Sequence, residues 1–485
     1  MNPSRSPGCP GFALRLALLL LLSVNSTGAA AHRLNRSPDS AALITADNPI
    51  SAAQDGHGNL HLVYTDSDPN GRKQVYCRSL RQGYLDIPVN LTGSSAAITG
   101  ASSGQIVYEP ESGNLYVAWI SRSPASGGYR LAVEQINAAD DTHAPVKVFD
   151  FGATNFPPKV IAASGKVFFL SQERLTPRGA DFFRVRVFLI RTGEWTEKRI
   201  ETTATEVVGY PTITASKNGA LLFWVQSTSN GHDVMVARMA ADQTQWSEAK
   251  LVFRSPALPE YLNAAAQDNT AILGWTLRGG AGNSILLQTV SRDSGNTWKA
   301  PAVLYSIGAN AIVAMQALSE KEMVALLYIS DPNGDKIKMK YTVNGAESWV
   351  PEREIDAIDI GPRKGAIEAR RPSLVIGNNK RLVVAWEERL TNDFLLVFKE
   401  GALQDFNASP SRALTVNETP TRYLYFPQLW SAGQKIYFTY GNKRRPVSVT
   451  EFIPKTDLYL AELSTARAPQ RSKPAAGKPR AIKNK

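Results

Sequence analysis

The stretch that decides the fold reads Ser291-Arg292-Asp293-Ser294-Gly295-Asn296-Thr297-Trp298. Asp and Ser side chains can hydrogen-bond the backbone of their own turn, and Gly295 can take the positive φ angle that closes the turn. Thr297 then continues into a strand, and Trp298 offers a large apolar side chain for burial. The octet therefore predicts a tight turn between two strands of a layered β structure.

Weaker copies of this octet occur elsewhere in the chain. One repeat later, an asparagine replaces the aspartate and the glycine has moved one place forward, in the run Thr342-Val343-Asn344-Gly345-Ala346-Glu347-Ser348-Trp349. Earlier units keep only Asp242-Gln243-Thr244-Gln245-Trp246 and Thr192-Gly193-Glu194-Trp195. Because such copies mark a structural repeat, we interpret all four as folding elements and not as catalytic groups.

An apolar strand that ends in an aromatic residue also recurs along the chain. Its copies end at Tyr64, Trp119, Trp224, Trp275, Tyr328, Trp386 and Tyr440, and a further copy over 166–171 lacks the aromatic residue. When the copy over 166–171 is counted, the ends of consecutive copies lie roughly 50 to 58 residues apart, which is a propeller-sized period. Helical periodicity is nearly absent. We expect an all-β fold, a single β-propeller of four-stranded blades, with eight blades preferred and seven as the alternative count.

The two ends of the chain predict how the ring closes. The last unit stops after 458–463 without an outer strand, whereas Ser40–Thr45 resembles an outer strand without a blade. We expect this N-terminal strand to complete the last blade, because closure removes both open sheet edges. The propeller is then expected over 41–464, after an N-terminal linker over 32–40.

Residues 1–31 have the pattern of a secretory signal peptide. Two arginines, Arg5 and Arg15, precede an apolar run over 16–24, and small residues follow at 29–31. The apolar run is too short to span a bilayer. We expect a secreted or periplasmic protein with no transmembrane segment, and a monomer. Cys77 is the one cysteine outside the signal peptide, so no internal disulfide is expected.

The formal net charge of the chain is +11, and basic residues recur among Pro, Ala and Gly over 465–485. This segment has no apolar period and predicts a disordered basic tail. Two interpretations of the tail remain open: a solubilising segment, or one that is attracted to an anionic surface.

The octet at 291–298 resembles the Asp box, also called the bacterial neuraminidase repeat, of sialidase-like β-propellers. The residues that carry the resemblance are Ser291, Asp293, Gly295, Thr297 and Trp298. In that family the box is a folding device between the third and fourth strands of a blade, and a central pocket lies on the opposite face. Sialidases proper have six blades, so the expected count departs from theirs.

The resemblance also implies which residues to seek for sialidase chemistry. That chemistry needs three arginines on the substrate carboxylate, a tyrosine nucleophile assisted by a glutamate, and an aspartate acid/base. The Phe/Tyr-Arg-Ile-Pro motif of the first arginine is missing, since the matching place reads Asp47-Asn48-Pro49-Ile50. This absence counts against ordinary exo-sialidase activity.

A candidate site remains at the start of two neighbouring blades. The catalytic candidates there are Tyr423 and Glu368, and the ligand-binding candidates are Arg370, Arg371 and Arg422. A guanidinium fork suits a carboxylate. Arginines at blade junctions also make purely structural ion pairs, and this alternative stays open.

No metal or cofactor is expected. The run Asp66-Ser67-Asp68-Pro69-Asn70-Gly71 resembles the opening of a calcium loop, but Cys77 takes the place of the bidentate glutamate. His57 and His61 stand four residues apart, with no acid to complete a zinc set.

Function hypotheses from different classes follow from these patterns. The first is an exported propeller that recognises a glycan or another, anionic, envelope or extracellular polymer without turnover. The second is a glycoside hydrolase of the sialidase-like group with a rearranged pocket. A scaffold role in envelope assembly is a further alternative, because a fold does not fix a function. The missing arginine motif favours the first hypothesis, and the Arg/Glu/Tyr cluster keeps the second open.

Overall fold

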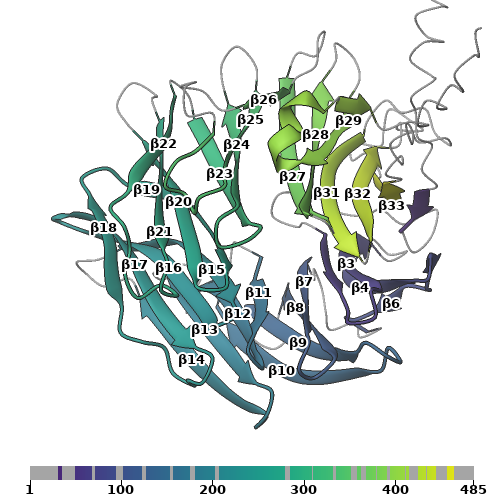
Figure 1. Ribbon diagram of the computed structural model, residues 1–485. Helices are drawn as coiled ribbons and strands as arrows, with labels where there is room; N and C mark the ends of the chain where they lie inside the picture. The colour runs from purple at the N-terminus through teal and green to yellow at the C-terminus, as the bar shows by residue number, and fades with distance from the viewer. Residues whose placement is uncertain are drawn as a thin grey trace, which may run out of the picture.

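The chain folds into eight antiparallel sheets that follow one another around a ring (Figure 1). The computed structural model describes residues 31–34, 50–67, 72–93, 102–122, 127–152, 157–174, 181–201, 207–278, 284–307, 310–330, 335–350, 358–361, 368–377, 380–389, 394–409, 411–413, 424–432, 434–443 and 456–463. The prediction of an all-β propeller with eight four-stranded blades is confirmed. Within the described ranges, no helix is long and apolar enough to cross a membrane.

The strands of each of blades 1 to 7 are consecutive in the sequence. Blades 1 and 2 comprise β2 (Ser51–Gln54), β3 (Leu60–Ser67), β4 (Lys73–Arg81), β5 (Tyr84–Leu85) and β6 (Val89–Asn90), then β7 (Ser102–Glu109), β8 (Asn114–Arg122), β9 (Tyr129–Asn137) and β10 (His143–Phe151). Blades 3 and 4 comprise β11 (Lys159–Ala163), β12 (Lys166–Arg174), β13 (Asp181–Leu189) and β14 (Glu194–Glu201), then β15 (Val207–Ser216), β16 (Gly219–Thr228), β17 (Gly231–Ala240) and β18 (Lys250–Ser255). In blade 1 the outer position is shared by β5 and β6, which both pair with β4.

The second half of the ring repeats this order. Blades 5 and 6 comprise β19 (Pro259–Gln267), β20 (Thr270–Arg278), β21 (Ser284–Ser291) and β22 (Ala302–Ile307), then β23 (Asn310–Ala317), β24 (Met323–Ser330), β25 (Lys336–Thr342) and β26 (Ile358–Gly361). Blade 7 comprises β27 (Glu368–Ile376), β28 (Arg381–Arg389), β29 (Phe394–Ala402) and β30 (Ser411–Ala413), with a short 3-10 helix, η3 (Leu403–Ala408), before its last strand. Blade 8 comprises β31 (Leu424–Ala432), β32 (Lys435–Lys443) and β33 (Thr456–Leu463), and its outer strand is β1 (Ala31–Arg33).

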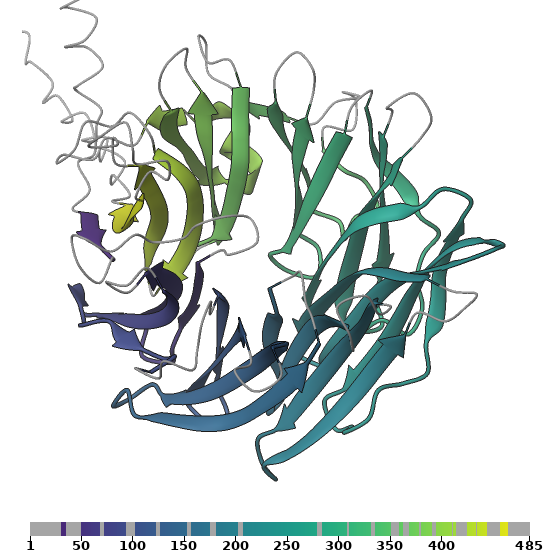
Figure 2. The same cartoon turned by 180° about the vertical axis from the view of Figure 1, so that it is seen from behind.

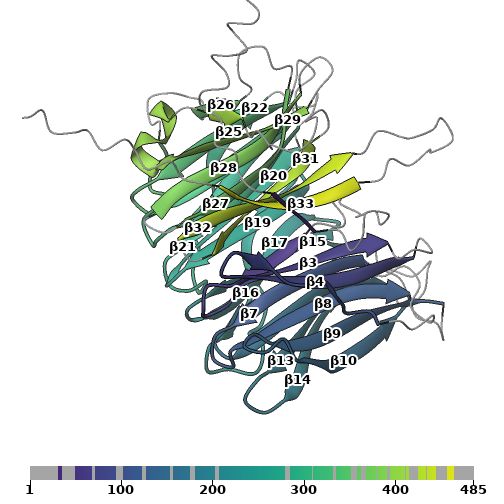
Figure 3. The ribbon, with the colours of Figure 1, turned by 90° about the vertical axis from the view of Figure 1, so that its right-hand side faces the viewer.

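The N-terminal strand closes the ring, as the sequence predicts, but it is an earlier segment than expected. The strand β1 pairs antiparallel with β33, and Figures 2 and 3 show these first and last strands side by side. The buried Leu34 extends the contact, since its carbonyl accepts a hydrogen bond from Tyr64 Oη of blade 1 at 2.6 Å. The expected closing strand, Ser40–Thr45, lies outside the described residues. We missed β1 because its short sequence has no apolar alternation and adjoins the predicted signal peptide.

The octet at 291–298 joins β21 to β22, the third and fourth strands of blade 5. Asp293 Oδ1 accepts from the Thr297 amide at 2.9 Å, and Asp293 Oδ2 accepts from Thr297 Oγ1 at 2.6 Å. Gly295 has a φ of +86°, and a Cβ there would lie 2.5 Å from Leu221 of the neighbouring blade. The indole of Trp298 packs edge-on against Phe223, with ring centroids 5.4 Å apart. The turn therefore joins blade 5 to blade 4.

A β-bulge interrupts the first strand of five blades, each time opposite the recurrent aromatic residue of the second strand. The bulges lie opposite Trp119, Trp224, Trp275, Trp386 and Tyr440, all of which are buried. Two inner residues there face one residue of the partner strand, and in three blades the second of the two is Pro211, Pro372 or Pro427. A proline fits because it has no amide to donate to a regular ladder.

The residue that opens the bulge adopts a left-handed backbone in three of these blades. The φ angles are +50° at Tyr210, +54° at Tyr261 and +48° at Arg371. Large side chains in this conformation are strained by on the order of 1 kcal/mol each. The left-handed φ turns each side chain out of the regular pleat. Both tyrosines are exposed, Tyr210 at 37% and Tyr261 at 40%. Strained positions with exposed side chains often mark functional sites, so these bulges are candidates for one.

Candidate ligand-binding cavity

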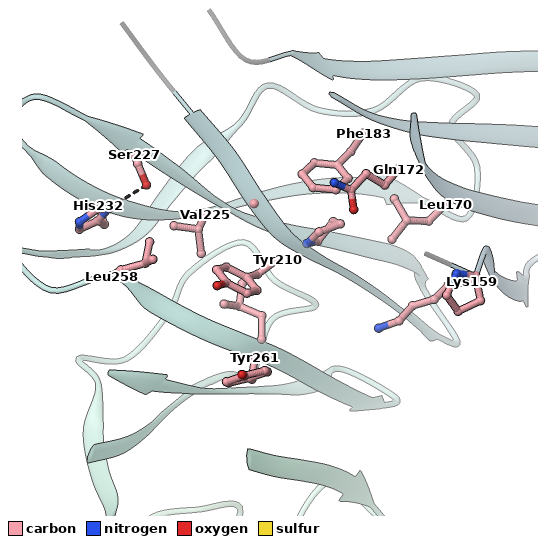
Figure 4. Close-up of a pocket in the computed structure, with 14 residues that line it drawn as sticks. Lys159, Leu170, Gln172, Phe183, Tyr210, Val225, Ser227, His232, Leu258 and Tyr261 are labelled. Carbon is pink, nitrogen blue, oxygen red and sulfur yellow. Dashed lines mark hydrogen bonds between the residues drawn. The ribbon is translucent and has the colours of Figure 1, made fainter. Parts of the chain in front are cut away.

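A cavity of about 660 Å³ lies between the inner strands of blades 3, 4 and 5 (Figure 4). Its walls come from the starts of β11, β15 and β19 and from the strands β12, β13, β16 and β17. The wall side chains are mainly apolar, and they include Leu170, Phe183, Val225, Leu258 and Leu262. A concave, largely apolar cavity with a few polar groups is the usual form of a small-ligand site.

Tyr210 and Tyr261 stand at this cavity because of the two bulges. Their ring centroids are 6.1 Å apart, with the ring planes inclined by 52°. The hydroxyl of Tyr210 donates to Glu260 Oε1 at 3.4 Å, and Glu260 Oε2 lies 3.0 Å from Arg278 Nε. Burial raises the pKa of Tyr210, and the negative charge of Glu260 raises it further. Tyr210 therefore remains a neutral hydrogen-bonding group, and both tyrosines have an accessible ring.

The polar groups of the cavity lie around the tyrosines. His232 Nδ1 and Ser227 Oγ are 2.7 Å apart, and the tautomer of His232 decides which of the two donates. Gln172 adds an amide, and Figure 4 shows it beside Phe183. Lys159 Nζ donates to Thr212 Oγ1 at 3.1 Å. Desolvation of this amine lowers its pKa. The residue as a whole is nevertheless exposed, so a ligand can reach it.

The predicted site residues of blade 7 lie together at the start of β27. Glu368 Oε2 accepts from Arg370 Nη2 at 2.7 Å, and Glu368 Oε1 accepts from Arg389 Nη1 at 3.0 Å. Arg370 Nε also donates to Asp335 Oδ2, at 3.2 Å. Burial opposes the charge of Arg370, but the carboxylates of Glu368 and Asp335 outweigh it and raise its pKa. Glu368 is thus already occupied by two guanidinium groups.

Arg371 forms an ion pair inside its own blade. Its Nη1 donates to both carboxylate oxygens of the buried Glu387, at 3.0 and 2.9 Å, and its side chain is 42% exposed. Arg371 is thus only partly buried, and its ion pair with Glu387 lies within blade 7. The other two predicted residues, Arg422 and Tyr423, lie outside the described residues, and their role stays a prediction.

Sequence reasoning missed Tyr210, Tyr261 and Lys159. Tyr210 precedes Pro211 just as Arg371 precedes Pro372. This shared X-Pro pattern could have placed Tyr210 at the equivalent bulge of its own blade. Tyr261 has no proline after it, and only its register opposite Trp275 reveals its position.

A serine–histidine–aspartate set occurs in blade 1, but it is buried. His61 Nδ1 is 2.8 Å from Ser79 Oγ, and His61 Nε2 is 3.0 Å from Asp55 Oδ2. The side chains of Asp55 and His61 have no exposed area, so we interpret the set as a structural link between a turn and the sheet. No group of three or more His, Cys, Asp or Glu residues that could hold a metal ion occurs in the described ranges.

No family model and no curated protein sequence matches this chain. Among solved structures, the WD40 domain of SCAP from fission yeast is similar at 9% identity, over 90% of this chain and 98% of that chain, with a TM-score of 0.47. An ulvan lyase of polysaccharide lyase family PL25 is similar at 13% identity, over 62% and 80%, with a TM-score of 0.41. A Hadza microbial sialidase is similar at 11% identity, over 57% and 62%, with a TM-score of 0.34. Likeness at this level assigns no activity, and no match to a sialidase-like family accompanies the resemblance of the octet to the Asp box.

Proposed function

We propose that this protein binds a saccharide in the cavity between blades 3, 4 and 5, without cleaving it. The observation that carries the proposal is the pair of strained, exposed tyrosines over an apolar cavity. A sugar ring has an apolar face of C–H groups and a rim of hydroxyls. Tyrosine rings can cover that face, while their hydroxyls and neighbouring polar groups bind the rim.

The composition of the cavity argues for binding over hydrolysis. Glycoside hydrolysis commonly uses a pair of carboxyl groups that flank the scissile bond. No aspartate or glutamate lines this cavity in the described part of the chain. Glu260, which accepts from the hydroxyl of Tyr210, is paired with Arg278. The cavity can therefore hold and orient a sugar but lacks the usual acid and base.

The setting of this function is outside the cytoplasm, if the predicted signal peptide over 1–31 directs export. The ligand would then be a glycan of the cell envelope or of the surroundings. The enzymatic alternative places catalysis on Tyr423 and Glu368 of blades 7 and 8.

A glycan array with the full chain, followed by calorimetry with the strongest ligand, tests the proposal. Replacing Tyr210 or Tyr261 by alanine should lower the affinity about tenfold or more, because buried aromatic contacts dominate such sites. Tyr84→Ala is the matched control, since Tyr84 lies on the outer edge of blade 1 and is 78% exposed. Unchanged affinity in both cavity variants contradicts the proposal. A fluorogenic sialoside assay with Tyr423→Phe as its control reports the enzymatic alternative.

A further inference from the structure

Lys159 brings a positive charge to the apolar cavity. It stands at the start of β11, and Figure 4 shows its side chain extending into the space that the tyrosines border. Its amine donates to Thr212 Oγ1 at 3.1 Å, which is a neutral acceptor. No carboxylate of the described residues forms an ion pair with Lys159.

Other lysines of the protein show how differently a lysine can be partnered. Lys198 also forms no ion pair within the described residues and donates to the Ser247 carbonyl at 3.4 Å, but it does not line the cavity as Lys159 does. Lys380 Nζ lies 2.5 Å from Glu322 Oε2, and Lys435 Nζ lies 2.9 Å from Glu462 Oε2. These two lysines are on the surface, where water would already stabilise their charge. Lys159 instead lines a mainly apolar cavity, where an ionic partner matters more, and its amine donates to a hydroxyl.

An ammonium group that lines an apolar cavity with only a hydroxyl as its partner is unfavourable for the protein alone. Desolvation disfavours the charged form, and this lowers the pKa of Lys159. In the same low-polarity surroundings, an anion that arrives next to the amine interacts with it strongly. A residue that is unfavourable in the free protein and favourable in a complex marks a binding position.

We infer that Lys159 binds a carboxylate of the saccharide, so that the ligand is an acidic sugar. This inference rests on the proposed function. It assigns the tyrosines to the apolar face of the sugar, and Lys159 to the acid group at the blade 3 end of the cavity. A hexuronic acid and a sialic acid both supply this chemistry. The net charge of +11 would also draw the protein towards an acidic polymer.

Calorimetry with two matched ligand pairs tests the inference. The first pair is trigalacturonate and its carboxyl-reduced form, and the second is sialyllactose and lactose. At least one acidic ligand should bind about tenfold or more tightly than its neutral partner. Lys159→Met should abolish that preference, and Lys159→Arg should keep most of it, since the charge is retained. Lys217→Met is the matched control, because Lys217 is exposed in the turn between β15 and β16, on the opposite face of the ring.

The outcomes separate the inference from the proposed function. Suppose that the acidic and the neutral ligand of a pair bind equally well, and that Tyr210→Ala binds neither. This result would overturn the inference but support the proposed saccharide binding. A preference that survives in Lys159→Met would also overturn it. Binding of neither pair, with no response on the array, would overturn both. A thermal unfolding curve for Lys159→Met is expected at or above that of the unaltered protein, so that lost preference reflects lost recognition and not misfolding.

Discussion

The cavity of blades 3, 4 and 5 and the arginine cluster at the start of β27 share one backbone device, yet they differ in how charge is balanced. Tyr210, Tyr261 and Arg371 all open a bulge with a left-handed φ. In the cluster, Glu368 and Glu387 are buried and their oxygens accept from arginines. In the cavity, Lys159 has only a hydroxyl partner. The difference teaches that charged residues that stand out in the sequence can pair with one another, whereas Lys159, which lines the cavity with the two tyrosines, keeps a charge that our proposal assigns to a ligand.

The largest effect is expected from removing both tyrosines. The double variant Tyr210→Ala/Tyr261→Ala should lower saccharide affinity about a hundredfold, because it removes both aromatic faces of the cavity. The affinity should be measured by calorimetry on protein whose circular dichroism is unaltered. An effect no larger than that of Tyr84→Ala would remove the distinction between the two regions.

A substitution in the cluster should act on stability instead. Glu368→Ala should lower the free energy of unfolding by about 1.5–3 kcal/mol, because it removes the carboxylate that accepts from both Arg370 and Arg389. Urea unfolding at neutral pH measures this change. We expect saccharide affinity to be retained in the folded variant. Loss of affinity with full stability would instead support the predicted ligand role of Glu368.

The turn at 291–298 lies on the opposite face and should affect stability alone. Asp293→Ala should cost about 1–3 kcal/mol through lost turn hydrogen bonds, with ligand affinity unchanged. Asp293→Asn should cost less, because Asn344 makes the equivalent contacts in the next blade, accepting from the Ser348 amide at 3.1 Å. Loss of binding in a folded Asp293 variant would show that the box lies on the ligand face.

The same turn should respond to acid. Burial raises the pKa of the Asp293 carboxyl, but hydrogen bonds from Thr297 and Ser291 outweigh it, and the net pKa lies below its usual value. The stabilisation is therefore present above the pKa of an unfolded aspartate, and it is lost as the pH falls through the folded value. Thermal unfolding over a falling pH series should show a smaller acid sensitivity in Asp293→Asn than in the unaltered protein. Identical acid sensitivity would contradict this assignment.

The smallest effect is expected for Arg371→Lys, which tests the sequence prediction for that residue. If Arg371 binds the ligand with its guanidinium fork, the lysine variant should lose about tenfold in affinity. If the arginine serves only its pair with Glu387, the affinity should hardly change, and this is the result that the cavity proposal predicts. The affinity of Arg371→Lys for the strongest array ligand, measured by calorimetry, shows whether the ligand binds at the arginine cluster or in the cavity.

The sequence predicts the fold well because a repeat exposes its own pattern. The spacing of Trp224, Trp275 and Trp386 predicts blades, and the turn residues from Ser291 to Trp298 predict how strands join. The closing strand was placed too late because Ala31–Arg33 is too short to show alternation. Its fit depends on Leu34 being buried between distant segments of the chain.

The site is less predictable because its decisive features arise from the backbone. Tyr210 and Tyr261 are ordinary residues in the sequence, and only the bulge and the left-handed φ turn them towards the cavity. Lys159 is likewise one lysine among many, and what marks it is its place in the cavity wall with no ion pair to a carboxylate of the described residues. The arginines of blade 7 stood out by type, but the sequence could not show that Glu387 faces Arg371 across β27 and β28.

The most direct test of the account is a crystal structure of the protein with the oligosaccharide that binds most tightly on the array. The account predicts density for a sugar against the rings of Tyr210 and Tyr261, with a carboxylate within hydrogen-bond distance of Lys159 Nζ. Density at Arg371 and Glu368 with an empty cavity between blades 3, 4 and 5 would contradict it.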